Sequence, residues 1–202
     1  MSNTITSIAS AALTHLGMRP LTDYTTSLAN NDPSAIAINT YWEQARDDVY
    51  REHRWTFNTT QETLGLIGEE LILGWLYLYT YPASAAMVWY VYNESTVTTK
   101  DAQEFEVVYV PTLNVTAVCS DNEEAYCDYG YKITDVTLWE PKFVQAFSYK
   151  LAAQMAHTLI GDPSIGVKMM EIYGAVISEA KRVGAQEKKK KREQTSGYVD
   201  AR

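Results

Sequence analysis

Apolar residues at the start of the chain recur at helical spacing. From Ile5 to Leu16 they fall on one stripe, which predicts a helix over residues 3–16. Gly17 follows as the expected stop signal, because glycine readily adopts the left-handed conformation that ends many helices. The next stretch, residues 19–31, is polar and contains a proline, so it is expected to be a loop.

Three more helices are predicted from start signals and apolar spacing. Asp32-Pro33 has the pattern of a cap followed by proline in the first turn, and the helix that it starts should end near Arg54. Two further helices, each with proline at its start, are expected over residues 141–160 and 163–192. The apolar stripe of the last helix is expected to consist of Val167, Met170, Tyr173, Ile177 and Ala180.

The middle third of the chain has a different composition. It is dense in tyrosine, tryptophan and β-branched residues, which favour strands over helices. Turn residues divide it into predicted strands at residues 71–81, 87–93, 105–109, 115–119 and 125–128.

These elements predict an α+β fold. An antiparallel bundle of about four helices, formed by residues 1–58 and 139–192, would carry an inserted antiparallel β domain over residues 59–138. Residues 193–202 are expected to be a flexible C-terminal tail.

One aromatic run in the β segment is a candidate interface. Four large side chains alternate along the first predicted strand, which would place them on one face: Trp75, Tyr77, Tyr79 and Tyr81. Core packing is the default interpretation. However, leucines occupy the opposite face, and a strand that is apolar on both faces is either covered on both sides or part of an interface, where Trp and Tyr are enriched.

Composition indicates a folded chain outside the membrane. The 202 residues are 46% hydrophobic and 21% charged, and no apolar run reaches the ~20 residues of a membrane helix. The N-terminus lacks the basic region of a signal peptide, which suggests the cytoplasm. Cys119 and Cys127 could face each other across neighbouring strands, but the favoured interpretation is that both are reduced, buried thiols. No metal site is predicted.

The charge of the chain is unevenly distributed. Residues 181–192 hold seven Lys/Arg against one Glu, so the remainder carries −14 once this +6 is subtracted from the total of −8. An acidic body does not suit a sequence-reading DNA-binding protein, because such proteins present a basic face. It does suit a protein that lies close to DNA without adhering to it.

The C-terminal basic run allows three interpretations. It comprises Lys188, Lys189, Lys190, Lys191 and Arg192. It lies beyond the point near Val183 where the apolar stripe ends, so it could be a solvated helix end. It could also dock on an acidic partner or, as the third interpretation, contact nucleic acid.

Catalytic motifs do not stand out in the sequence. It contains no nucleophile elbow, P-loop, dinucleotide fingerprint or H-E-x-x-H pattern, so no enzymatic activity and no cofactor are predicted. The nearest enzyme-like features are carboxylates beside an aromatic residue: Glu69, Glu70, Trp75, Glu104 and Glu106. Paired carboxylates could cleave a glycan, but Glu104 and Glu106 are more simply placed on one solvated strand face. His53 could be a pH-sensitive interface residue, although a helix-end role beside a core tryptophan is favoured.

The order of several short motifs resembles a known family. They are Leu16-Gly17, REHRWTFN at 51–58, Tyr81-Pro82, WEPKFV at 139–144, LIGD at 159–162 and SGYVDAR at 196–202. Over nearly the whole chain they resemble the tail tubular protein A family, the head-to-tail adaptors of short-tailed bacteriophages.

The resemblance implies a structural virion protein. It would form a dodecameric ring between the portal protein and the tail nozzle, a tubular protein B-like partner, with tail fibres as a further contact. Genomic DNA would pass through the lumen during ejection without sequence-specific binding, and the ring would be assembled in the host cytoplasm with no membrane insertion. The basic run would dock on the portal, and the aromatic run would face another subunit or the nozzle. The alternatives are a glycan-binding or glycan-cleaving tail component and a small cytoplasmic assembly chaperone.

Overall fold

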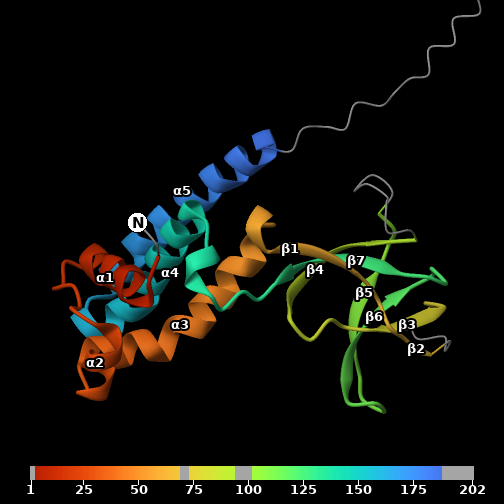
Figure 1. The fold of residues 1–202 in the computed structure, drawn as a ribbon, viewed down its shortest axis with the longest axis horizontal. Helices are drawn as coiled ribbons and strands as arrows, with labels where there is room; N and C mark the ends of the chain where they lie inside the picture. Colours follow the sequence, from red (N-terminus) through yellow and green to blue (C-terminus); the bar gives the residue numbers. More distant parts are fainter. Residues whose placement is uncertain (1–2, 69–72, 94–101, 188–202) are drawn as a thin grey trace, which may run out of the picture.

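The computed structural model describes residues 3–68, 73–93 and 102–187, with side chains up to residue 183. The chain is a mixed α+β protein with antiparallel sheets. Helices gather at one end of the molecule and strands at the other (Figure 1). The helices are α1 (Ile5–His15), α2 (Tyr24–Ala29), α3 (Pro33–Glu52), α4 (Pro141–Ile160) and α5 (Pro163–Glu187), with 3₁₀ turns η1 (Thr56–Asn58) and η3 (Val136–Leu138). The strands are β1 (Thr59–Thr63), β2 (Leu66–Gly68), β3 (Tyr77–Thr80), β4 (Ala85–Tyr92), β5 (Glu106–Val110), β6 (Val115–Ser120) and β7 (Tyr126–Tyr131).

Local capping sets the helix ends, as the sequence predicted for Asp32 and Gly17. At the start of α1, Ser7 N–H donates to Thr4 Oγ1 and Thr4 N–H donates to Ser7 Oγ, both at 3.0 Å. At the start of α3, the Asp32 carboxylate accepts from Ser34 N–H at 2.8 Å. Glycines after α1 and α4 have φ values of +73° and +75°, so both helices end in the left-handed conformation.

The segment expected to be a loop contains a short helix. The Asp23 carboxylate accepts from Thr26 N–H at 2.7 Å and caps α2, so the prediction of a loop over residues 19–31 was wrong here. Six residues are too few to show apolar periodicity, and this helix buries none of its residues.

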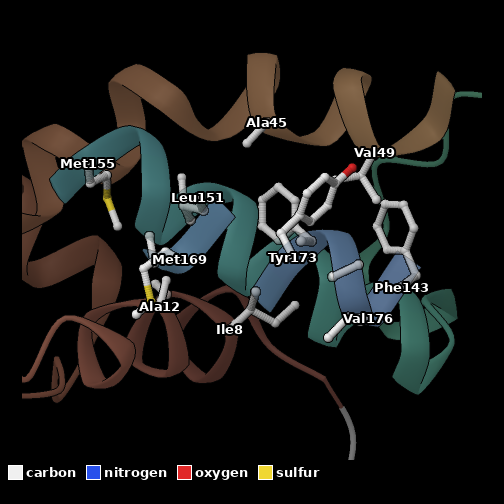
Figure 2. Close-up of a cluster of buried hydrophobic side chains, with 14 of the residues drawn as sticks. Ile8, Ala12, Ala45, Val49, Phe143, Leu151, Met155, Met169, Tyr173 and Val176 are labelled. Atoms are coloured by element: carbon white, nitrogen blue, oxygen red, sulfur yellow. The ribbon is translucent and has the colours of Figure 1, made fainter. Parts of the chain in front are cut away.

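One hydrophobic core joins helices from both ends of the sequence. Side chains of α1, α3, α4 and α5 point toward one another in it (Figure 2). Helix α4 packs in this core with residues of the N-terminal helices. The cluster includes these residues, none more than 1% exposed: Ile8, Ala12, Val49, Phe143, Phe147 and Leu151.

The buried face of α5 differs from the predicted stripe in the first turns. Met169 is 7% exposed and lies in the core, whereas Val167 and Met170 are 60% and 41% exposed. Tyr173, Ile177 and Ala180 are buried as expected. In the first turns of α5, Met169 is therefore the side chain that packs into the core, and the two large apolar side chains Val167 and Met170 lie on the exposed side of the helix.

The described strands form two antiparallel sheets. A three-stranded sheet has the order β1-β7-β4, and a four-stranded sheet has the order β2-β3-β6-β5. The predicted strands at 87–93, 105–109, 115–119 and 125–128 correspond to β4, β5, β6 and β7. Of the predicted strand at 71–81, β3 covers four residues, and residues 71–72 lie outside the described part.

The first two strands were missed by the sequence reasoning. Four of the five residues of β1, TTQET, are exposed, so the segment shows no apolar alternation. It is a strand because it pairs with β7, from Thr59 opposite Gly130 to Thr63 opposite Tyr126.

A second core lies between the two sheets. Tyr79 and Val118 of the four-stranded sheet pack with Val91 and Cys127 of the three-stranded sheet. Cys119 belongs to a smaller cluster that also contains Leu78. Both thiols are free and buried, as predicted, and they lie in different sheets, so the alternative that they face each other across neighbouring strands does not hold.

Candidate interaction surfaces

The aromatic run is divided between two environments. Tyr77, Tyr79 and Tyr81 pack against the core between the sheets, whereas Trp75 precedes β3 and packs against the smaller cluster that contains Leu78. The expectation that all four aromatics share one strand face is therefore corrected for Trp75, because regular alternation begins only where β3 begins. Tyr79 is 1% exposed, so its ring offers no surface to a partner. The interface role of the other three stays a prediction.

The four-stranded sheet has a larger apolar surface than the aromatic run suggested. Half of the large hydrophobic residues that are exposed on the described chain lie on its strands and adjoining turns: Leu66, Ile67, Leu73, Leu76, Val107, Tyr109, Leu113 and Val115. Concentration of exposed apolar residues in one region is typical of a binding surface.

A single row of side chains crosses this sheet from edge to edge. Leu66 of β2 is opposite Tyr79 of β3, Tyr79 is opposite Val118 of β6, and Val118 is opposite Val107 of β5. The two central residues are at most 1% exposed, whereas Leu66 and Val107 at the ends are 49% and 44% exposed. Because directly paired residues share a face, the row is apolar throughout and open at both ends.

Of the carboxylates considered for glycan chemistry, Glu104 and Glu106 lie in the described part of the chain. Glu106 starts β5 and accepts a hydrogen bond from Trp75 Nε1 at 3.1 Å, while Glu104 precedes the strand and is exposed. Glu69 and Glu70 lie outside the described residues. The Trp75–Glu106 contact places one aromatic side chain beside one carboxylate at the surface.

Charged residues line an open hollow between α3 and α4. Its volume is about 380 Å³, and it is lined by Asp48, Arg51, Glu52 and Lys150. Lys150 Nζ lies 3.1 Å from Asp48 Oδ2, so one of the acids and one of the bases neutralise each other. Beside them, the Tyr173 hydroxyl is buried and finds no hydrogen-bond partner among the described residues, and burial, together with Glu52 and Asp48, raises the pKa of Tyr173.

A second charged pair joins α3 to the three-stranded sheet. Arg54 Nη2 lies 2.7 Å from Asp128 Oδ2, and both side chains are largely buried. The Tyr92 hydroxyl donates to the same carboxylate oxygen at 3.2 Å, and burial, with the carboxylate beside it, raises the pKa of Tyr92. An aspartate inside the aromatic strand β7 is the one signal of this pair that is visible in the sequence, and its partner Arg54 is 74 positions away.

Two histidines take structural positions. The His15 ring stacks on Tyr149 with centroids 3.9 Å apart, and its Nε2 lies 3.1 Å from Ser148 Oγ. Burial lowers the pKa of His15. His53 ends α3 with its ring 4.9 Å from that of Trp55, which agrees with the helix-end role beside a core tryptophan.

The predicted portal-docking run lies outside the described residues. These are Lys188, Lys189, Lys190, Lys191 and Arg192. Within the described side chains of α5, the last buried residue is Ala180, and Lys181 and Arg182 are exposed. The end of the apolar stripe near Val183 therefore agrees with the sequence prediction.

The described residues hold neither a metal-binding cluster nor a membrane-spanning helix. No three His, Cys, Asp or Glu side chains among them come together in a group that could hold a metal ion. Over the same residues, no helix combines the length and apolar character needed to cross a membrane. No known protein family and no curated protein matches the sequence.

Proposed function

We propose that this chain is the subunit of a ring-shaped adaptor that joins the head of a short-tailed bacteriophage to its tail nozzle. The observation that carries the proposal is the meeting of two motifs that support the resemblance, one in residues 51–58 and one in residues 139–144. The ring of Phe143 lies 4.8 Å from Trp139, 5.2 Å from Trp55 and 5.2 Å from Phe57, measured between centroids. Motifs that are distant in sequence thus form one aromatic cluster.

The same cluster supports a helical bundle with an inserted β domain. The chain leaves the helical core after Trp55 and returns to it at Trp139. Asn58 Nδ2 donates to Tyr131 O at 3.2 Å, and the Tyr50 hydroxyl donates to Ile133 O at 2.8 Å, so the outgoing and returning segments lie side by side. Segments that leave and re-enter one domain side by side are the geometry expected of an insertion. We assign residues 59–138 to the inserted domain.

The charge distribution supports passage of DNA through the ring. Outside residues 181–192 the chain carries −14, obtained by subtracting +6 from −8. A lumen lined by acidic and small polar side chains would repel phosphates and prevent DNA from adhering during ejection. In this assembly the C-terminal basic run would bind an acidic surface of the portal, and the opposite face of the ring would bind the nozzle.

The size of the assembly tests the proposal. Full-length chain would be mixed with the portal protein of the same virion and imaged by negative-stain electron microscopy. We expect a ring of about twelve chains on the portal, in keeping with the closed cyclic symmetry of most homo-oligomers. A chain that stays monomeric with portal, and that releases sugars from host surface polysaccharide, would replace this proposal with the glycan-cleaving alternative.

Truncation separates docking from folding. A chain ending at residue 187 retains every described element, so its midpoint of thermal unfolding should remain almost unchanged. Attachment to the portal should be lost, because the basic run is absent. A matched variant with residues 188–192 kept and residues 193–202 removed should still attach. Normal attachment of the shorter chain would disprove the docking role.

A further inference from the structure

The four-stranded sheet has two unpaired edges among the described strands, β2 on one side and β5 on the other. Natural edge strands are commonly protected by lysine or proline, and neither residue type occurs in β2 (LIG) or β5 (EVVYV). Their exposed side chains are apolar at Leu66, Ile67, Val107 and Tyr109. Both edges can therefore accept another strand.

Strand direction makes these two edges complementary to each other. Each neighbouring pair in the order β2-β3-β6-β5 is antiparallel, so β2 and β5 run in opposite directions within one subunit. When two copies lie side by side in the same orientation, β5 of one therefore meets β2 of the next as an antiparallel neighbour. The alternation of the sheet continues across the boundary.

The apolar row fits the same arrangement. Its exposed ends, Leu66 and Val107, lie on one face of the sheet because each is linked to Val118 through directly paired positions. In a continued sheet, Leu66 of one copy would lie next to Val107 or Tyr109 of the other. Contacts between cross-strand apolar side chains stabilise a sheet, and the exposed ends of the row would become buried.

The edges of the three-stranded sheet do not offer this fit. β1 and β4 both pair antiparallel with β7 and therefore run parallel to each other. β1 is polar, with sequence TTQET, so it offers no large apolar side chain to a neighbouring strand. A continued sheet through these edges would be parallel and would bury little apolar surface.

We propose that copies of this chain associate head-to-tail through the β5 edge of one subunit and the β2 edge of the next. The inference rests on the proposed ring and names the surface between its subunits. Because the two edges differ, the contact is heterologous, which is the kind that generates rings when the rotation closes. β2 has three residues, and a short strand pair is marginal in water, so association should require high protein concentration or the portal as template.

Site-directed cross-linking tests the contact. Leu66→Cys and Val107→Cys are made separately and together in the full chain. They are treated at high protein concentration with a bismaleimide of about 8 Å reach, which covers opposite and diagonal cross-strand positions. The native thiols Cys119 and Cys127 are 0% exposed, and cross-linking of the chain without introduced cysteines measures the background from these two thiols. Leu138→Cys, 60% exposed and far from the sheet edges in sequence, replaces Leu66→Cys in the matched control.

The products distinguish the possible contacts. The double variant should give a ladder of dimers, trimers and larger species, the mixed single variants should give dimers, and each single variant alone should stay monomeric. Dimers from one single variant alone would show an isologous contact and overturn the inference. Yields no higher than those of the Leu138→Cys control would also overturn it.

Native mass spectrometry of the same samples separates this inference from the proposed function. A closed ring without cross-links between residues 66 and 107 would refute the edge contact and leave the adaptor proposal intact. A ladder that grows into open filaments, both alone and with portal, would support the edge contact and refute the closed ring.

Discussion

Truncation of Phe143 should destabilise the helical core more than any surface change. Phe143 is fully buried and lies between rings supplied by both ends of the helical sequence, with Tyr50 stacked against it at 4.7 Å. Figure 2 shows its side chain pointing toward α3, near Val49. The perturbation is Phe143→Ala, which removes the ring but keeps the helix, since alanine has the highest helix propensity.

The expected loss follows from transfer and packing terms. Moving a Phe side chain into the core contributes about 2–3 kcal/mol. If about 100 Å³ of the vacated volume stays empty, the cavity costs a further ~2 kcal/mol. The free energy of unfolding should therefore fall by about 3–5 kcal/mol, the range typical of buried Phe→Ala changes. The midpoint of thermal unfolding should fall by roughly 6–20 °C in a chain of this length.

Urea unfolding followed by far-UV circular dichroism measures the loss. The midpoint should decrease while the slope m stays constant, because the folded topology is unchanged. Leu138→Ala, at a side chain 60% exposed, is the control and should change stability by less than ~0.5 kcal/mol. A loss below ~1 kcal/mol for Phe143→Ala at constant m would refute the packing argument.

Three further predictions concern other parts of the fold. Burial lowers the pKa of His15 in the folded state, so the unfolded state binds the proton at a higher pH. The free energy of unfolding should therefore fall as pH decreases from about 6.5 toward the lower native pKa. His15→Phe, which retains a stacking ring, should flatten this pH dependence of the urea midpoint. Arg54→Met should cost about 2–4 kcal/mol in urea unfolding, because the Asp128 carboxylate, largely buried, loses its cation, and a neutral cost would contradict this. Gly161→Ala should destabilise the protein by ~1–2 kcal/mol from backbone strain alone, since φ is +75° and an added Cβ meets nothing within 4 Å. Gly174→Ala, where an added Cβ also meets nothing but the residue lies inside α5, should stabilise it by up to ~1 kcal/mol. Stability changes of the same sign in the two variants would refute the conformational argument.

Helices were predictable because their signals are local. The Thr4 cap, Pro33 and Gly161 each act within one helical turn, so the residues that set these helix ends lie next to one another in the sequence. The buried face of α5 in its first turns could not be inferred with the same certainty. Val167, Met169 and Met170 are all apolar, and only the position of α4 decides which of them is covered.

Strand partners depend on residues far apart in the chain. β1 is polar along its length and becomes a strand because β7 pairs with it. The row from Leu66 to Val107 depends on three registers, and a shift of one residue in any of them would move its side chains to the opposite face. The aromatic run was visible, but its division at Trp75 depended on where β3 begins.

The packing of α1 has a consequence for the order of events during synthesis. Besides the nearby residues Leu21 and Tyr24, the N-terminal segment contacts the last third of the chain: Asn3 Nδ2 donates to Trp139 O across 136 positions, and His15 Nε2 lies close to Ser148 Oγ across 133. At about 5–20 residues per second, a ribosome needs roughly 7–27 s to make that intervening stretch. During this time the apolar stripe of α1 lacks its main packing partner, α4, while the described strands of the two sheets are being made. The nascent chain must therefore keep its first helix from misassociating until α4 emerges.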